Sequence, residues 1–332
     1  MTTNKSIHLM KRPTGGPIDD SLFEIRENDV REINDGEVLV KQNMMSLDPA
    51  MFGWMSPDTE SYIPPVELGD VMRSSGIGEV VASKSDKFQV GDRVMGMMGW
   101  QHYFVGSAEG LNKIEAPVSD EAVLSVFALP GLTATQGLIR VGQPKSGETL
   151  IVTGAAGSVG SIVGQLAKAE GLHVIGVVGS DEKAEWITKE LGFDGAINYK
   201  TDDLAAKLEE LAPNGIDVFF ENTGGPIQHH IFERMNAHGR VVVCGLIADY
   251  PKAEPAPGPS WLNVIKKRIR IEGFTMPDHF GEIPQLLQTL TPYVMGGKVK
   301  YRAHTLEGLE SAITGLNLFF TGDNKGKLVV KF

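Results

Sequence analysis

The chain has 332 residues, of which 42% are hydrophobic and 22% are charged, and its formal net charge is −11. This composition is typical of a folded globular protein and excludes a largely disordered chain, while the length exceeds what one hydrophobic core usually organises. The acidic balance argues against nucleic acid and against an anionic membrane surface as partners, because both require concentrated positive charge.

Cysteine usage and the first residues of the chain indicate the compartment. Cys244 is the only cysteine, so an internal disulfide and a cysteine-based metal cluster are excluded, and we expect a reducing, cytoplasmic environment. The first residues lack the apolar core of a signal peptide, and no run of about 20 apolar residues stands out, so we expect neither export nor a membrane span. The adjacent His229 and His230 would point to different faces of a helix, and we expect no metal site.

The first 124 residues predict a separate β domain. Short alternating strands are expected at residues 37–41, 76–81 and 92–95, separated by turns with glycine and proline, in a barrel-like arrangement. Several large apolar side chains gather in one segment of this region. They are interpreted either as the wall of an adaptable apolar pocket or as core, and they are Met44, Met45, Met51, Phe52, Trp54 and Met55.

The most informative segment is an apolar strand over residues 149–153 that leads into a glycine-rich turn and then into a helix. Its glycines fall three residues apart, which allows a tight turn, a close approach to a pyrophosphate and close packing of the helix on its strand. The helix N-terminus would then face the anion. We therefore expect a dinucleotide cofactor to bind along the turn, at Gly154, Ala155, Ala156, Gly157, Ser158, Val159 and Gly160.

The end of the next apolar strand distinguishes the two nicotinamide cofactors. An acidic side chain there would bind the adenosine ribose hydroxyls of NAD, but this chain has Gly179 and Ser180. Ser180 can cap a helix that begins at Asp181, which places Lys183 in a first turn where the helix dipole disfavours a cation. A 2′-phosphate would supply the missing anion, so NADPH is favoured over NADH. The alternative is an exposed lysine paired with Glu185 or with solvent.

Strand and helix patterns alternate up to about residue 300. Strands are expected at residues 173–178, 196–199, 217–221, 240–245 and 269–274, with helices at 202–211 and 226–235. Such strands with crossover helices form a doubly wound parallel sheet, so residues 125–300 are expected to be a Rossmann domain. The tail predicts a strand at 299–303, a helix at 307–318 and a closing strand at 327–332. Residues 301–332 would thereby complete the domain of residues 1–124.

Motifs spread over nearly the whole chain resemble those of one enzyme family. They are SLDPAMFGW at 46–54, YIPP at 62–65, GDRV at 91–94, ALPGLTA at 128–134, ENTGG at 221–225, CGLIADY at 244–250 and GKLVV at 326–330. They are similar to the zinc-independent alkenal, prostaglandin and curcumin reductases of the medium-chain dehydrogenase/reductase superfamily. The resemblance implies an α/β fold with a GroES-like, β-barrel-type catalytic domain beside the Rossmann domain, NADPH as cofactor, and a homodimer.

The resemblance also implies roles for single residues. Lys183 and Tyr199 correspond to residues that bind the 2′-phosphate, beside Gly179 and Ser180. The nicotinamide half of the cofactor would be surrounded by Asn222, Cys244, Gly245, Tyr250, Phe274, Met276 and Asn324. Tyr62 resembles a tyrosine that contacts substrate, although it could equally pack at a β-edge. Relatives often have a basic residue where this chain has Trp54, which is expected to alter the mouth of the substrate pocket.

The implied reaction reduces the C=C bond of a small hydrophobic α,β-unsaturated aldehyde or ketone without a metal. Hydride delivered to the β-carbon pushes negative charge onto the carbonyl oxygen, and a hydrogen-bond donor must meet that charge. Tyr250 stands where the family has a tyrosine implicated in catalysis. Together with a ribose hydroxyl of the cofactor it would stabilise the enolate, and Tyr250 or water would protonate the α-carbon. The alternative is that Tyr250 is only a loop aromatic.

Two other functions stay open from the sequence. A zinc-independent quinone reductase would share the fold and the cofactor. A non-catalytic nucleotide-binding relative would share the fold, although Tyr250, Lys183 and Tyr199 speak against it. Residues 269–272 are the candidate strand edge through which two copies of the chain would pair.

Overall fold

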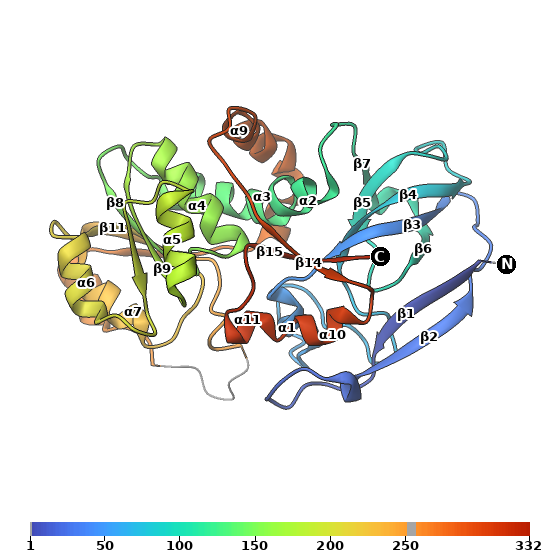
Figure 1. Ribbon diagram of the computed structural model, residues 1–332, viewed down its shortest axis with the longest axis horizontal. Coiled ribbons are helices and arrows are strands. Elements are labelled where there is room, and N and C mark those ends of the chain that lie inside the picture. Colours follow the sequence, from blue (N-terminus) through green and yellow to red (C-terminus); the bar gives the residue numbers. More distant parts are fainter. Residues whose placement is uncertain (1, 251–256) are drawn as a thin grey trace. The chain divides into compact units, whose positions relative to one another are not determined.

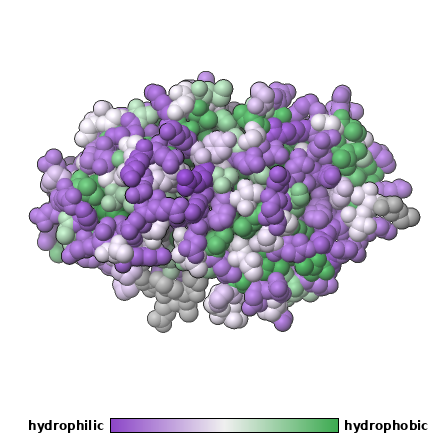
Figure 2. All heavy atoms as spheres, in the orientation of Figure 1, coloured by the Kyte–Doolittle hydropathy of each residue, from purple (hydrophilic) through white to green (hydrophobic). Residues whose placement is uncertain are grey.

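A computed structural model describes residues 2–250 and 257–332, and within them the chain forms two compact units (Figure 1). The first unit comprises Met1–Leu124, Ala303–Asp323 and Leu328–Phe332, and the second comprises Ser125–Arg302 and Asn324–Lys327. Hydrophilic side chains cover most of the face shown in Figure 2, with small apolar areas between them.

The second unit is built on a six-stranded sheet in the order β10-β9-β8-β11-β12-β13, in which every neighbouring pair is parallel. The earliest strand, β8, therefore lies beside β11 rather than at an edge, and the strand order reverses between them. The strands are β8 (Thr149–Thr153), β9 (His173–Val178), β10 (Gly195–Asn198), β11 (Ile216–Glu221), β12 (Met235–Val243) and β13 (Arg270–Gly273). This confirms the predicted doubly wound Rossmann sheet.

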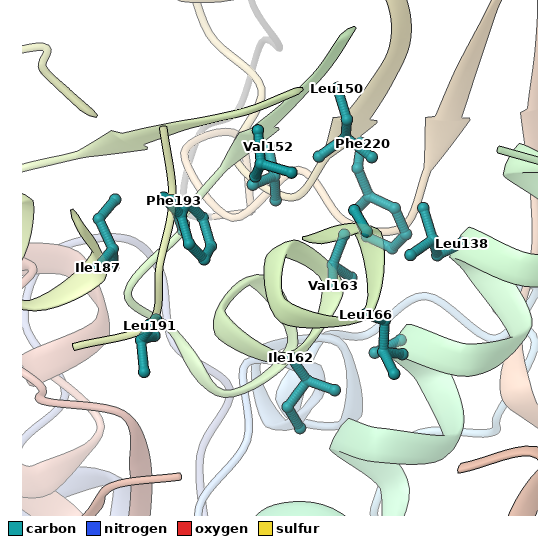
Figure 3. Close-up of a cluster of buried hydrophobic side chains, with 14 of the residues drawn as sticks. Leu138, Leu150, Val152, Ile162, Val163, Leu166, Ile187, Leu191, Phe193 and Phe220 are labelled. Carbon is teal, nitrogen blue, oxygen red and sulfur yellow. The ribbon is translucent and has the colours of Figure 1, made fainter. Parts of the chain in front are cut away.

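Apolar side chains on both faces of this sheet are buried under helices. Along β8, Leu150 and Val152 pack in a core with α4, whereas Ile151 packs in a second core with α6 and α7. Figure 3 shows the first core, with Ile162 and Val163 of α4. The helices of this unit are α3 (Leu129–Thr135), α4 (Ser158–Ala169), α5 (Asp181–Lys189), α6 (Leu204–Leu211), α7 (Ile227–Glu233), α8 (Trp261–Lys267) and α9 (Ile283–Met295).

The first unit holds an antiparallel sheet and a separate two-stranded hairpin of β1 and β2. The seven-stranded sheet has the order β14-β15-β3-β4-β5-β7, and β6 pairs with β3 off this path. The strands are β1 (Thr3–Leu9), β2 (Phe23–Asp29), β3 (Glu37–Ser46), β4 (Ser75–Ser83), β5 (Arg93–Met97), β6 (Tyr103–Ser107), β7 (Leu111–Lys113), β14 (Ala303–Glu307) and β15 (Lys327–Lys331). The predicted closing strand is confirmed as β15, which pairs antiparallel with β3.

The methionine-rich segment of the first unit is core. Helix α1 (Ala50–Met55) buries Met51, Phe52, Trp54 and Met55, and Met44 and Met45 of β3 are also buried. Most of these side chains join one cluster with Leu309, Ala312 and Ile313 of the tail. The pocket-wall interpretation of this segment is therefore wrong, because the side chains are packed against one another. Trp54 is 5% exposed and packs in the same core, and its expected effect on the mouth of the substrate pocket stays a prediction.

The tail differs from the sequence prediction at two places. The strand predicted at residues 299–303 begins four residues late, as β14 at Ala303, and Val299 is instead a single buried residue in the core of the second unit. The helix predicted at 307–318 begins later, at Ser311, because the chain turns at Gly308 with a φ of 79° directly after β14, and it is divided into α10 (Ser311–Gly315) and α11 (Leu318–Thr321). The apolar periodicity there reflects contact of both short helices with one core.

One continuous helical run, Asp120–Gly142, is long and apolar enough to cross a membrane by length and composition, contrary to the expectation that no such run exists. It consists of the short helix α2 (Asp120–Ala122), α3 and two π-helical stretches. The protein buries 78% of its apolar window. A helix that is apolar on all sides and covered by its own protein has the properties of a core helix.

Candidate cofactor site

The glycine turn after β8 has the backbone geometry of a dinucleotide-binding turn. Gly154 adopts a φ of 61°, and its carbonyl oxygen accepts a hydrogen bond of 2.8 Å from the Gly157 N–H. A Cβ placed at Gly160 would lie 2.4 Å from the Gly154 carbonyl oxygen. Only glycine fits that position without a shift, because real Cβ contacts are longer. The turn therefore brings bare backbone to the start of α4.

Helix α4 begins at this turn without a side-chain cap. Its N-cap residue is Gly157, whereas α5 is capped by the Ser180 hydroxyl and α6 by the Asp203 carboxylate. The first N–H groups of a helix lack partners within the helix and attract anions. An uncapped helix behind a glycine turn therefore suits a phosphate group better than it suits a purely structural role.

A short segment from the end of the chain lies beside the same turn. Gly157 forms a parallel β-bridge with Gly326, and Asn324, which is 9% exposed, donates a hydrogen bond of 3.2 Å to the Gly326 carbonyl oxygen. Lys325 forms an ion pair of 2.7 Å with Glu182 in the first turn of α5. The bridge therefore brings the predicted cofactor residue Asn324 to the glycine turn, although the two are more than 160 positions apart in the sequence.

The predicted 2′-phosphate residues gather at the end of β9. Ser180 caps α5 by accepting a hydrogen bond of 3.3 Å from the Lys183 N–H, which confirms the predicted capping. Tyr199, which is 51% exposed, lies beside Gly179, where an added Cβ would be 3.3 Å from the tyrosine hydroxyl. Lys183 and Tyr199 therefore come from elements that flank one strand end.

A buried hydrogen-bond network joins the ends of β8 and β11. The Asn222 N–H donates to the Thr153 hydroxyl oxygen (2.9 Å), and the Asn222 side-chain amide donates to the Thr153 carbonyl oxygen (2.8 Å). The Thr153 hydroxyl in turn donates to Glu221 Oε1 (2.5 Å). Asn222 is thereby fixed at the first residue after β11, next to the glycine turn.

The loop after β12 carries Tyr250 over the same edge. Its start is held by hydrogen bonds from the Cys244 and Gly245 N–H groups to the Glu221 carbonyl oxygen (2.9 and 3.2 Å). The Leu246 N–H donates to the Tyr250 hydroxyl oxygen (3.4 Å), and the Tyr250 side chain is 46% exposed. Burial raises the pKa of the Cys244 thiol to about 12, so it stays protonated. The loop therefore offers a partly exposed phenol and an unreactive thiol.

The remaining predicted residues lie in different settings. Met276 is buried in a small cluster with Leu132 and Leu286, and Phe274 packs against the same cluster. Tyr62 belongs to the first unit and is 60% exposed. Among the residues that the structure describes, no three His, Cys, Asp or Glu side chains gather as they would around a metal ion.

Comparison with known proteins identifies the family. Residues 5–114 match a family model described as the N-terminal domain of oxidoreductase, and residues 158–291 match one described as zinc-binding dehydrogenase. The NADPH-dependent curcumin reductase of Escherichia coli is 39% identical, with 99% of this chain and 96% of that protein covered. The chain belongs to the NADP-dependent alkenal and curcumin reductase subfamily of the medium-chain dehydrogenases/reductases.

Other members of the alkenal and curcumin reductase subfamily agree over the full length. The NADP-dependent 2-alkenal reductase of Nicotiana tabacum is 38% identical, covering 99% of this chain and 97% of that protein. The crystal structure of CurA from Vibrio vulnificus in complex with NADPH is similar with a TM-score of 0.93 and 36% identity, covering 98% of each chain. The fold expected for this subfamily is therefore confirmed.

Sequence reasoning missed two side chains of this reductase at the sheet edge. In the sequence, Glu221 belongs to the ENTGG motif at 221–225 without a role of its own, and Thr153 is only the last residue of an apolar strand. The available signal is a carboxylate at the end of the apolar run 218–220, since a charged side chain beside a buried strand needs a partner.

Proposed function

We propose that this protein reduces the C=C bond of α,β-unsaturated aldehydes and ketones with NADPH. The observation that carries the proposal is the carboxyl edge of the second unit's sheet, where the glycine turn and the uncapped start of α4 follow β8 and the Tyr250 loop follows β12, with β11 between these two strands. Ligands of doubly wound sheets bind where the strand order reverses, which here is between β8 and β11. The names of the relatives, a curcumin reductase and a 2-alkenal reductase, support the same chemistry.

The residues present fit NADPH. The turn from Gly154 to Gly160 leaves no room for a Cβ at its last glycine, as a cradle for a pyrophosphate requires. Lys183 and Tyr199 would hold the 2′-phosphate with a cation and a hydroxyl, beside Gly179 and Ser180. The nicotinamide half would be held by Asn222, Cys244, Gly245, Tyr250, Phe274, Met276 and Asn324. The NADPH bound in the CurA structure supports this assignment.

The chemistry requires a donor for the substrate oxygen. Bound NADPH supplies a hydride for the β-carbon of the substrate. We propose that Tyr250 donates a hydrogen bond to the carbonyl oxygen as negative charge develops there, which lowers the barrier. A phenol can donate as well as accept a hydrogen bond, and the Tyr250 oxygen accepts one from the Leu246 N–H. Tyr62, which is largely exposed on the first unit, is proposed as a substrate contact.

The test follows NADPH absorbance with a simple enone such as 3-nonen-2-one, beside NADH and a quinone as comparisons. We expect oxidation of NADPH by the enone and at most weak oxidation of NADH. Turnover of the quinone without the enone would replace the proposal by a quinone reductase. No turnover with either acceptor would favour a non-catalytic nucleotide-binding protein.

We also propose that two copies pair through β13. This strand is an edge of the six-stranded sheet, and all its residues are exposed. The preceding helix α8 exposes Trp261 and Ile265, each 74% accessible. Apolar side chains beside an open strand edge are typical of an interface. Light scattering should give twice the mass of the chain, and a monomer would contradict this assignment.

The net charge of −11 and the single cysteine support a cytoplasmic enzyme that binds a small hydrophobic substrate rather than nucleic acid or a membrane.

A further inference from the structure

Glu221 is a buried carboxyl group that the proposed reaction does not use directly. It is the last residue of β11 and only 1% of its surface is exposed. Burial raises its pKa, and hydrogen bonds from Thr153 and Thr223 offset only part of that effect. Burying a carboxyl group costs free energy unless hydrogen bonds compensate for the lost water, so the groups that bind it indicate its role.

The side chain of Glu221 accepts hydrogen bonds from Thr153 and Thr223, which lie on the two sides of the reversal of strand order. Oε1 accepts from the Thr153 hydroxyl (2.5 Å), from the Thr223 N–H (2.7 Å) and from the Thr223 hydroxyl (3.2 Å). Thr153 directly precedes the glycine turn, and Thr223 lies between Asn222 and Gly224, which has a φ of 73°. One oxygen atom therefore connects the glycine turn with the loop after β11.

The direction of the Thr153 hydroxyl depends on this carboxyl group. A hydroxyl has one hydrogen to donate, and here it is donated to Glu221 Oε1. Its lone pairs are thereby left to accept the Asn222 N–H at 2.9 Å. Without Glu221, the hydroxyl would be free to turn its hydrogen elsewhere, and the hydrogen bond that fixes Asn222 beside the turn would weaken.

We propose that Glu221 is a positioning residue that holds the glycine turn and Asn222 in the geometry that binds the cofactor. The inference rests on the proposed function, because it concerns the binding of NADPH. Glu221 Oε2 is buried and has no hydrogen-bond partner within residues 2–250 and 257–332. Burial raises the pKa of this group, so its charged form is disfavoured at this position.

An amide keeps a carbonyl oxygen that can accept these hydrogen bonds, and this gives the conservative variant. Glu221→Gln keeps an oxygen that accepts from Thr153 and Thr223, whereas Glu221→Leu removes the acceptor and keeps a similar volume. Thr153→Val removes the hydroxyl of the same hydrogen bond, and Thr153→Ser retains it. Glu148→Leu is the matched control, because Glu148 lies at the opposite end of β8 and its side chain is 17% exposed.

The experiment measures NADPH affinity by calorimetry, melting temperature without cofactor, and steady-state kinetics with the enone. We expect Glu221→Leu and Thr153→Val to raise the Kd for NADPH by about 10-fold or more, the loss of roughly one hydrogen-bonded contact. The KM for NADPH should rise with it, while kcat at saturating NADPH changes less than about 3-fold. Glu221→Gln and Thr153→Ser should bind within about 3-fold of the wild type.

The double variant of Glu221→Leu and Thr153→Val should bind no more weakly than the weaker single variant, because both remove the same hydrogen bond. Glu148→Leu should melt earlier and bind NADPH as the wild type does. The inference is overturned if Glu221→Leu binds normally, or if Glu148→Leu weakens binding as strongly. If Glu221→Leu does not fold, equal affinities of Thr153→Val and Thr153→Ser overturn it. Failure of the wild type to bind NADPH would instead reject the proposed function.

Discussion

At the amino edge of the six-stranded sheet, charged side chains pair with each other, whereas at the carboxyl edge backbone groups and one buried carboxyl group surround a glycine turn. At the amino edge, Glu148 and Arg240 form an ion pair with side chains 17% and 13% exposed. Asp217 accepts hydrogen bonds from the Thr149 N–H and the Asn236 amide there (2.9 and 2.8 Å). These polar side chains bind one another, so few of their hydrogen-bonding groups are left to bind a ligand.

The carboxyl edge is built in the opposite way. Gly154, Gly224 and Gly225 adopt positive φ angles, helix α4 begins without a side-chain cap, and Glu221 Oε2 is buried without a partner in the described part of the chain. Each of these features costs stability when nothing is bound. The comparison teaches that the same strands serve stability at one end and binding at the other, so substitutions at the two ends should affect different measurements.

The largest effect is expected at Tyr250. Tyr250→Phe should lower kcat with the enone by about 100-fold or more, as expected for the loss of one donor to a developing oxyanion, and should leave the Kd for NADPH within about 2-fold. Stopped-flow and steady-state assays with titration of NADPH measure both. Tyr301→Phe is the control, because Tyr301 has a similar exposure of 41%. Unchanged turnover in Tyr250→Phe would remove Tyr250 from the reaction.

A methyl group in the glycine turn should damage binding more than stability. In Gly160→Ala the new Cβ meets the Gly154 carbonyl oxygen at 2.4 Å, so the turn must open, and we expect the Kd for NADPH to rise by about 10-fold or more. Gly147→Ala at the amino edge is the comparison. Gly147 has a φ of 87°, so alanine there should cost about 1 kcal/mol of stability and leave binding unchanged. Equal affinities of the two variants would break the contrast between the edges.

Cofactor selectivity tests the end of β9. Lys183→Ala should raise the Kd for NADPH by roughly 10-fold, which corresponds to the loss of one charge-assisted hydrogen bond, and should leave the Kd for NADH unchanged. Lys189→Ala at the other end of α5 is the control, since Lys189 is 70% exposed and paired with Glu185. Calorimetric titration of each variant with NADPH and with NADH measures these dissociation constants. A parallel loss of both affinities would make Lys183 a structural residue.

The smallest effect is expected in the dependence of stability on pH. Burial raises the pKa of Glu221, so its contribution to folding is greatest below about pH 4.3 and is lost as the pH rises. Burial also acts on Glu148, but hydrogen bonds from Arg240 and Lys145 outweigh it and lower its pKa, so its contribution is lost as the pH falls. Between about pH 3 and 8, and relative to the wild type, Glu221→Gln should therefore gain stability as the pH rises above about 4.3, whereas Glu148→Gln should lose stability as the pH rises toward about 4.3, each by about 1 kcal/mol. Urea unfolding across this range measures both, and slopes of the same sign would contradict the assignment.

The sequence predicted the strands of the second unit because each one is a short apolar run between turn signals. It placed the start of β12 five residues late, because Met235 pairs with Ile216 before the regular apolar residues begin. It could not predict the network of Thr153, Glu221 and Asn222, since partners 68 positions apart meet only through the order of the strands. It gave the methionine-rich segment two interpretations because periodicity alone does not distinguish a core from a pocket wall.

The bridge between Gly157 and Gly326 has a consequence for how this protein could be divided or recombined. Residues 125–302 run through the second unit without a break, yet Asn324–Lys327 returns to it before the last strand. A fragment cut at residue 302, or a chimera that exchanges residues 125–302 between two relatives, would separate the glycine turn from its own bridging segment. Compatible recombination therefore requires exchanging residues 324–327 together with the turn, as one discontinuous module.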